Sequence, residues 1–335
     1  MESSRARRRR RPLSYAALAF VVIVGGAAAG TVYMKAQAHS GGSAVSSAVT
    51  PSASASASVS ARAGGEASVE PVAQPTVDHD VLLAEAMESV TVEDGAEVSV
   101  AVLDLESGAS ASYGNRGFDT ASIVKVDILA ALLLQAQDAG RELTATEKSQ
   151  AADMIEKSDN TAASALWRAI GRAEGLDSAN ERLGLTDTEG GDGMYWGLTQ
   201  TTAADQLTLL QQVFGEDSEL SARSRAYLQE LMGEIAVDQQ WGVSAAADGS
   251  AWALKNGWLP RTATGLWDIN SMGRVTVDSR DCLVAVLSDG NSTKAKGVSL
   301  VEAAAEAAVS VFAEANETSS GSPTAAASAS AASPS

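Results

Sequence analysis

The sequence holds one cysteine, Cys282, and two histidines, His39 and His79, among its 335 residues. A single cysteine cannot form an internal disulfide, and one so far along the chain cannot carry a lipid directly after an export signal. Both histidines lie in or beside a Ser- and Ala-rich stretch near the N-terminus. A Ser-His-Asp triad inside a folded domain is therefore excluded, and a zinc site of histidine and cysteine ligands nearly so.

Positive charge is also scarce, since 24 lysines and arginines face 42 aspartates and glutamates and leave a net charge of −18. Such acidity argues against nucleic acid as a partner. The chain has neither a Gly-x-x-x-x-Gly-Lys loop nor a Gly-x-Gly-x-x-Gly after a strand, the patterns typical of phosphate and dinucleotide binding. We expect no cofactor and no metal.

The densest run of positive charge lies at the N-terminus. Residues 1–12 carry six arginines, and residues 13–34 are uncharged and mostly apolar. About 20 such residues span a bilayer, whereas the apolar region of a signal peptide has about 7–15. Ala36-Gln37-Ala38 is nevertheless typical of a cleavage site. We expect a transmembrane anchor or a signal peptide at 13–34, with residues 1–12 cytoplasmic and the rest outside the membrane or secreted.

Two further stretches are too poor in large apolar residues to build a core. Residues 35–78 and 317–335 are dominated by Ser, Ala, Gly and Pro, and we expect a disordered linker and a disordered tail. One folded domain, residues 79–316, remains between them.

Within this domain, strands are expected at both ends and helices between them. Strand patterns occupy residues 97–105, 110–113, 252–256, 266–277 and 282–287, and helix patterns residues 81–90, 122–138, 144–157, 161–170, 205–214, 221–232 and 298–312. This order predicts an α+β fold, in which an antiparallel sheet is flanked by helices and an all-α lobe is inserted in the middle.

The helix expected after residue 118 begins with a candidate nucleophile. Residues three apart share a helix face, so the Ser122 hydroxyl is expected beside the Lys125 amine. The neighbours of Lys125 are almost all apolar, and burial lowers the pKa of a lysine until it can accept a proton from a serine. With His79 only at the very edge of the domain, we expect lysine to take the role of the base.

Two more motifs follow in order. Ser158-Asp159-Asn160 lies in a polar turn between two helices, and Lys255-Asn256-Gly257 lies on an expected strand. Ser-x-x-Lys at a helix start, then Ser-Asp-Asn, then Lys-x-Gly resembles the serine β-lactamases and penicillin-binding proteins, most closely the class A β-lactamases. The resemblance covers roughly residues 81–316. It implies the β-lactamase/transpeptidase-like fold, with a five-stranded antiparallel sheet.

The resemblance also implies roles for individual residues. Ser122 would be the acylated nucleophile, Lys125 its proton acceptor, and Ser158 the relay to the leaving nitrogen. Asn160 would bind the substrate amide, and Lys255 and Asn256 a substrate carboxylate. Gly257 would leave room for a substrate along the strand, and the N–H groups of Ser122 and Trp258 would form the oxyanion hole.

Two departures from the family pattern concern its chemistry. Asn256 stands where the family has Thr or Ser, and an amide cannot act as a hydroxyl relay. Residues 184–200 lie where class A enzymes keep the glutamate that activates the deacylating water, and the expected place falls near Thr186. The acidic residues of this segment, Asp187, Glu189 and Asp192, do not form the family's Glu-x-x-x-Asn pattern.

The sequence therefore predicts an exported serine hydrolase that is acylated at Ser122 by β-lactams or related cell-wall amides, with deacylation in doubt. One alternative is a D-alanyl-D-alanine peptidase-like enzyme that acts on peptidoglycan stem peptides. The other is a non-catalytic module that retains only the penicillin-binding fold. Arg261 is a further candidate for binding a carboxylate, and Tyr195 and Trp196 are candidates for a cleft wall. The sequence leaves the oligomeric state open.

Overall fold

The structure is a computed structural model and describes residues 77–249 and 251–320, with side chains up to residue 313. The segments expected at 1–12 and 13–34 lie outside this part of the chain, as do most of the expected linker and tail. Within the described part, none of the helices combines the length and the apolar character that a membrane span needs.

Five strands form one antiparallel sheet, as the sequence predicts. They are β1 (Glu97–Asp104), β2 (Ser110–Tyr113), β5 (Trp252–Pro260), β6 (Trp267–Val277) and β7 (Arg280–Asn291), in the order β2-β1-β7-β6-β5. The register places Glu97 opposite Asp289 and Lys255 opposite Met272. β5 and β7 run further than expected. Pairing with Asn270 of β6 holds Gly257 in β5, and β7 continues past Gly290, which takes a φ of 72° at an irregularity of the β6–β7 pairing.

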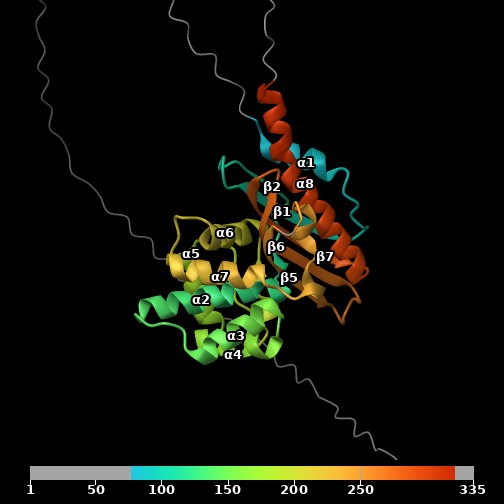
Figure 1. Cartoon of the computed structure of the whole chain (residues 1–335). Coiled ribbons are helices and arrows are strands. Elements are labelled where there is room, and N and C mark those ends of the chain that lie inside the picture. Colours follow the sequence, from blue (N-terminus) through green and yellow to red (C-terminus); the bar gives the residue numbers. More distant parts are fainter. Residues whose placement is uncertain (1–76, 250, 321–335) are drawn as a thin grey trace, which may run out of the picture. The chain divides into compact units, whose positions relative to one another are not determined.

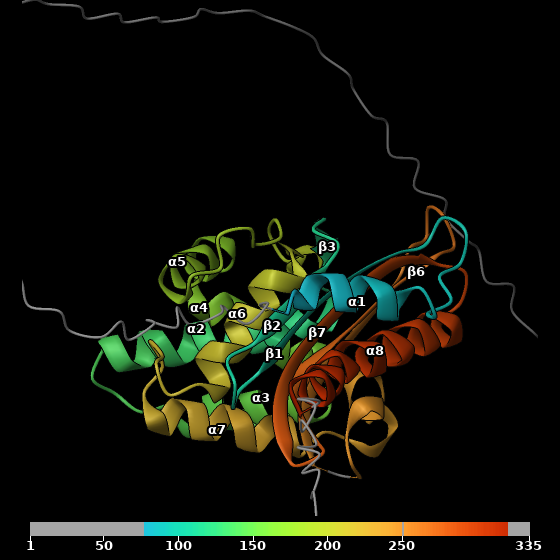
Figure 2. The ribbon, with the colours of Figure 1, turned by 90° about the horizontal axis from the view of Figure 1, so that it is seen from above.

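The central strands are buried on both faces. Val100, Val102 and Val284 belong to one apolar core, and Ala101 and Leu103, the alternate residues of β1, belong to another. The first core is covered by α1 (His79–Met87) and α8 (Lys294–Ser320), the second by α2 (Val124–Asp138) and α6 (Ala203–Phe214) (Figures 1 and 2). α8 continues to Ser320, into the stretch expected as tail.

The remaining helices form a lobe beside the sheet (Figure 1). They are α3 (Ala145–Glu156), α4 (Asn160–Ile170), α5 (Ala173–Leu183) and α7 (Ala222–Gly233). Their buried apolar residues, among them the fully buried Trp167 of α4, belong to the same core as those of α2. The predicted capping box of α3 is present, with the Thr144 hydroxyl and the Glu147 carboxylate each accepting from the other's backbone N–H. α5 is not among the helices expected from the sequence.

The start of the nucleophile helix differs from the prediction. Phe118–Asp119 form a short strand, β3, that pairs with β4 (Gln200–Thr201), and Ala121–Ile123 form a 3-10 turn, η1. The α-helix begins only at Val124. Ala121 has a left-handed φ of 48°, which an α-helix cannot accommodate, and the Asn270 amide of β6 holds the carbonyls of Asp119 and Thr120.

Candidate active site

Ser122 lies in η1, between the start of α2 and the edge strand β5. It is half-buried and lines a cleft of about 610 Å³. The cleft is bordered by α4, by residues 194–198 and by the end of β5, and its lining is Ala121, Ser122, Asn160, Ser164, Met194, Tyr195, Trp196, Gly197, Leu198, Trp258, Leu259, Pro260, Arg261, Thr262 and Ala263. The sequence-predicted nucleophile is thus open to a small molecule.

Lys125 is completely buried behind Ser122, one turn along. Its Nζ lies 3.0 Å from Ser122 Oγ, 2.9 Å from Ser158 Oγ, 2.7 Å from the Ser158 carbonyl oxygen and 2.8 Å from Asn160 Oδ1. These contacts join α2 to the turn before α4. The amine is therefore fixed within proton-transfer distance of two serine hydroxyls.

Ser158 has a left-handed φ of 55°, which costs a residue other than glycine about 1–2 kcal/mol. This conformation goes together with a carbonyl and a hydroxyl that both contact Lys125. The next residue, Asp159, caps α4 by accepting from the Ala162 N–H at 2.7 Å. The same turn therefore both caps α4 and contacts Lys125.

Lys255 reaches the same turn from the sheet. Its Nζ lies 3.1 Å from Ser158 Oγ and donates to the backbone carbonyl oxygen of Asn256 at 3.0 Å. The Lys255 side chain is almost completely buried. Ser122, Lys125, Ser158 and Lys255 therefore form one continuous chain of polar contacts that comes from three separate segments. Asn160 adjoins it through Lys125.

The electrostatics of this chain favour neutral amines. Burial lowers the pKa of Lys125 to about 7, against a smaller opposing effect of the Asp159 charge. Burial also lowers the pKa of Lys255 well below its usual range, and the nearby Lys125 charge lowers it further. An uncharged amine beside Ser122 at neutral pH is what proton abstraction from a hydroxyl requires.

The structure gives a different reason for Gly257 than the one expected from the sequence. A Cβ atom there would lie 2.7 Å from the Thr120 carbonyl oxygen and 2.8 Å from the Ser122 backbone nitrogen. Glycine therefore lets β5 approach η1, and the room that it would leave for a substrate stays a prediction. The approach brings Trp258, the next residue, to the cleft that Ser122 lines.

Asn256, the predicted partner of a substrate carboxylate, does not join this site. Its amide nitrogen donates to the carbonyl oxygens of Gln239 and Trp241 at 2.7 and 2.8 Å, and the residue is 1% exposed. Successive side chains of a strand point to opposite faces, so Lys255 and Asn256 cannot both face the α-helical lobe. The Asn256 amide is thus engaged away from the cleft, and its assignment to substrate binding stays a prediction.

The wall opposite β5 is aromatic and carries no carboxylate. Tyr195 and Trp196 line the cleft, and the indole ring of Trp196 lies with its centroid 5.0 Å from Lys125 Nζ. Asp187, Glu189 and Asp192 are exposed, and neither they nor Thr186 belong to the cleft lining. Among the described residues, the structure therefore reveals no carboxylate placed to activate water near Ser122.

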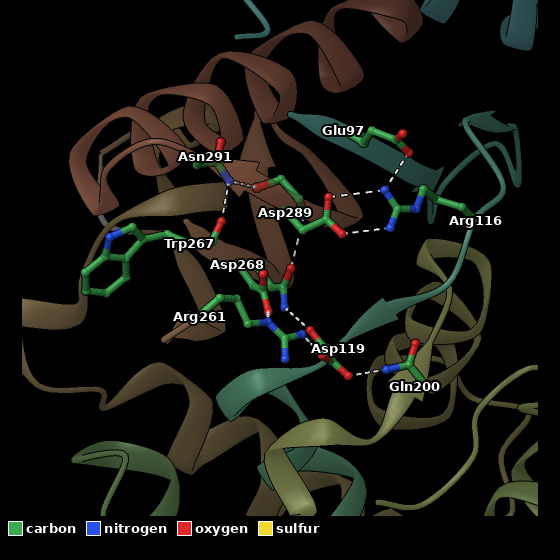
Figure 3. A network of polar contacts seen from close by, with 11 residues as sticks. Glu97, Arg116, Asp119, Gln200, Arg261, Trp267, Asp268, Asp289 and Asn291 are labelled. Atoms are coloured by element: carbon green, nitrogen blue, oxygen red, sulfur yellow. Dashed lines mark hydrogen bonds and ion pairs between the residues drawn. The ribbon is translucent and has the colours of Figure 1, made fainter. Parts of the chain in front are cut away.

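Arg261 lines the cleft, but two carboxylates already engage it (Figure 3). It forms ion pairs with Asp119 of β3 and with Asp268 of β6, the latter at 2.6 Å. Nearby, Arg116 is shared in the same way by Glu97 and Asp289, at 2.5 and 2.7 Å. A guanidinium already paired with two carboxylates is a poor binding site for a third. Arg261 instead connects β3 to β6 through Asp119 and Asp268.

A buried network that the sequence did not single out anchors the aromatic wall. Asp127 of α2 is fully buried, accepts from Gln206 Nε2 at 3.2 Å, and burial raises its pKa to about 7. Gln206 also donates to Thr201 Oγ1, which contacts Thr188 Oγ1 at 2.8 Å. The sequence feature that could have indicated this network is Asp127 itself, a charged residue among the apolar residues of α2. The network ties residues 184–200 to the helix that carries Lys125.

Comparison with solved structures identifies this fold. A mutant of PBP-A, described as an acyl-enzyme complex with penicillin G, is 21% identical, has a TM-score of 0.60, and is matched over 70% of this chain and 97% of that one. The TLA-1 extended-spectrum β-lactamase is 15% identical, with a TM-score of 0.61 and coverage of 70% and 98%. A class A β-lactamase from Bacteroides cellulosilyticus is 15% identical, with a TM-score of 0.60 and coverage of 71% and 100%. At these identities the likeness establishes the fold.

Comparison of sequences adds relatives and a family. A protein of Mycobacterium tuberculosis and one of Mycobacterium bovis, both named "Putative lipoprotein LppW", are 29% identical over 266 residues, which is 75% of this chain and 83% of each relative. A sequence model of the Beta-lactamase enzyme family matches residues 142–312, a range that includes Ser158 and Lys255 and begins after Ser122. The chain belongs to the Beta-lactamase enzyme family.

Proposed function

We propose that this chain is an exported serine hydrolase of the class A β-lactamase type, acylated at Ser122 by β-lactams or by related cell-wall amides. The observation that carries the proposal is the single run of contacts from Ser122 Oγ through Lys125 Nζ and Ser158 Oγ to Lys255 Nζ. It stands at the edge of a cleft large enough for a drug-sized ligand.

In the acylation step, Ser122 Oγ forms a bond to the carbonyl carbon of the amide while its proton moves to the neutral Lys125 amine. The C–N bond then breaks, and the leaving nitrogen takes the proton of the Ser158 hydroxyl. Lys125, now an ammonium 2.9 Å from Ser158 Oγ, returns a proton to that oxygen. The balance is one serine ester, one amine and a site restored to its starting charge. The amine leaves from a linear amide but stays attached to the acyl group when a β-lactam ring opens.

The remaining groups would bind and polarise the substrate. Asn160 Oδ1 is occupied by Lys125, which leaves its amide N–H groups to donate to the substrate's own amide carbonyl. Lys255 would keep the potential around Ser158 positive whenever it is protonated. The N–H groups of Ser122 and Trp258, brought together where β5 meets η1, would hold the oxyanion.

We propose that hydrolysis of the Ser122 ester is the slower of the two steps. A water would have to lose a proton as it attacks, and no carboxylate among the described cleft residues can take it. Acyl-enzyme should therefore form faster than it is hydrolysed, and a covalent adduct should accumulate.

The experiment is intact-protein mass spectrometry after incubation with benzylpenicillin, run beside the Ser122→Ala variant. The proposal expects an adduct of the mass of the intact drug on the parent protein and none on Ser122→Ala. Rapid consumption of the drug with no trapped adduct would contradict slow deacylation. An adduct on both proteins would contradict the assignment of Ser122.

A peptidase acting on D-alanyl-D-alanine is the second candidate, favoured by the same absence of a carboxylate from the described cleft wall. A stem-peptide analogue would then be turned over while penicillin remains bound. Release of D-alanine, absent from Ser122→Ala, distinguishes this activity. Failure of every penicillin and peptide to react at Ser122 would leave a non-catalytic module.

Export is proposed on composition and on the names of the relatives. Residues 1–12 and 13–34 would be the basic segment and the anchor or signal peptide, residues 35–78 the linker, residues 79–316 the hydrolase domain and residues 317–335 the tail. Both relatives are named as lipoproteins, whereas the cysteine of this chain, Cys282, is buried in β7. Cell fractionation, with N-terminal sequencing of the mature protein, separates an anchored from a cleaved form.

A further inference from the structure

Trp196 occupies the side of Lys125 that the hydrogen-bonding groups leave open. The polar contacts of the amine are to Ser122, Ser158 and Asn160, and the indole ring covers it at 5.0 Å. The ring is fixed to the helical lobe, since its Nε1 donates to Ser164 Oγ of α4 at 3.2 Å. Trp196 is half-buried and also lines the cleft beside Ser122.

The backbone that carries this ring is tied down at several points. Glu189 and Gln200 exchange backbone hydrogen bonds of 2.9 and 3.0 Å across the base of the segment. At its tip the Gly193 carbonyl accepts from Trp167 Nε1 at 2.9 Å, and a Cβ at Gly191 would lie 2.2 Å from the Tyr195 carbonyl oxygen. The indole is therefore held against Lys125 by the fold.

An indole and a carboxylate act differently beside an amine. The face of a ring attracts an ammonium group, but indole has only an N–H donor and cannot accept a proton. Hydrolysis of an ester at Ser122 requires a water oxygen to bond to the acyl carbon, one water proton to go to a base, and the Ser122 oxygen to leave and be protonated. A ring in this place supplies no base and fills space that such a water would need.

We propose that Trp196 is a positioning residue that stabilises the Lys125 ammonium formed during acylation and shields the resulting ester from water. The proposal rests on the proposed acylation of Ser122 and goes beyond it, because it assigns the slow second half of the cycle to one side chain. On this proposal the acyl-enzyme accumulates because Trp196, in the segment of residues 184–200, lies against Lys125 where a base for water would be needed.

The test measures the acylation rate constant and the acyl-enzyme lifetime with benzylpenicillin, by mass spectrometry before and after removal of free drug. Trp196→Phe keeps a ring over Lys125, Trp196→Ala opens the space, and Trp196→Glu adds a carboxylate. The control is Asp192→Asn, an exposed carboxylate on the same segment that does not line the cleft. Melting temperatures show which variants fold.

We expect the lifetime of Trp196→Phe and of the control to stay within about twofold of the parent. It should fall about tenfold in Trp196→Ala, and by about 10²-fold or more in Trp196→Glu, the usual gain from a positioned base. A merely structural role would not move the pH profile. The charged groups near Lys125 are Lys255 and Asp159, and a carboxylate added at position 196 should move half-maximal acylation to higher pH.

Lifetimes within twofold of the parent in both Trp196→Ala and Trp196→Glu would overturn the proposal. If Trp196→Glu does not fold, Trp196→Ala decides it alone. This failure is distinct from failure of the proposed function, which would show as no adduct on the parent protein at all.

Discussion

Lys125 Nζ and Lys255 Nζ meet at one oxygen, the Ser158 hydroxyl, at 2.9 and 3.1 Å. One amine comes from a helix and the other from the edge strand of the sheet. Two ammonium groups this close, both buried, would repel each other strongly, so the pair is most stable with at least one proton missing. The hydroxyl between them can receive a proton from one side and pass it to a substrate on the other.

The pH dependence of acylation follows from the state of Lys125. Since burial lowers its pKa to about 7, the neutral base predominates only above that value. The rate of Ser122 labelling should therefore rise as the pH increases through about 7 and then level off. Lys125→Met should lower the rate by about 10²–10⁴-fold. Fluorescent-penicillin labelling across this range measures both, with the exposed Lys157→Met as the control, and a flat profile in the parent protein would contradict the assignment.

Ser158 combines a chemical role with a strained backbone, and two substitutions separate these properties. Both Ser158→Gly and Ser158→Ala remove the hydroxyl, so both should lower acylation by about 10²–10⁴-fold. Only glycine relieves the left-handed φ, and Ser158→Gly should therefore be more stable than Ser158→Ala by about 1 kcal/mol. Urea denaturation compares the free energies of unfolding. Equal stabilities would show that the turn stores no strain.

Gly257→Ala tests how closely β5 must approach η1. The added methyl group would collide with the Thr120 carbonyl and the Ser122 nitrogen, and overpacking of this kind costs about 1–3 kcal/mol. We expect lower stability together with slower acylation, because the shift separates Trp258 from Ser122. Gly233→Ala, where the added Cβ meets nothing within 4 Å, is the matched control. Normal labelling kinetics in Gly257→Ala would show that this approach does not matter for the site.

The buried Asp127 makes stability depend on pH in the opposite sense from an ordinary aspartate. Its folded pKa is raised to about 7, above the unfolded value of about 3.9, so its unfavourable effect is absent at low pH and grows as the pH rises through this interval. Asp127→Asn should be stabilising relative to the parent at pH 8, on the order of 1 kcal/mol or more, and close to neutral at pH 4. Thermal unfolding at the two pH values measures this. A gain that is larger at the acidic pH would contradict the raised pKa.

The motifs predicted the members of the polar chain because their order along the sequence matches the order of segments in this fold. Ser122 and Lys125 are close for a local reason, the spacing of one helical turn. Their meeting with Ser158 and Lys255 depends on packing between the lobe and the sheet, which only the resemblance to a family anticipated. The five-stranded sheet was predicted for the same combination of reasons, since alternating apolar strands lie at both ends of the domain.

The sequence did not predict several contacts of the candidate site, each for a specific reason. Asn256 was assigned from its place in a motif, and strand alternation turns its side chain to the other face. Trp196 lies in the irregular segment of residues 184–200, and no periodic pattern in the sequence predicts its contact with Lys125. Arg261 was considered as a free cation, but the carboxylates that engage it lie on β3 and β6 and could not be paired with it from sequence alone.

The pairing of β1 with β7 also sets the timing of folding. These strands lie near the two ends of the described chain and are adjacent in the sheet, as Glu97 and Asp289 show. Contacts between such distant segments form late, since a long loop must close first. During synthesis, which proceeds from the N-terminus, Ser122 would emerge long before Lys255 and the strands that hold it. The nucleophile would thus remain inert until almost the whole domain has been delivered, and a truncated chain should carry the serine without its reactivity.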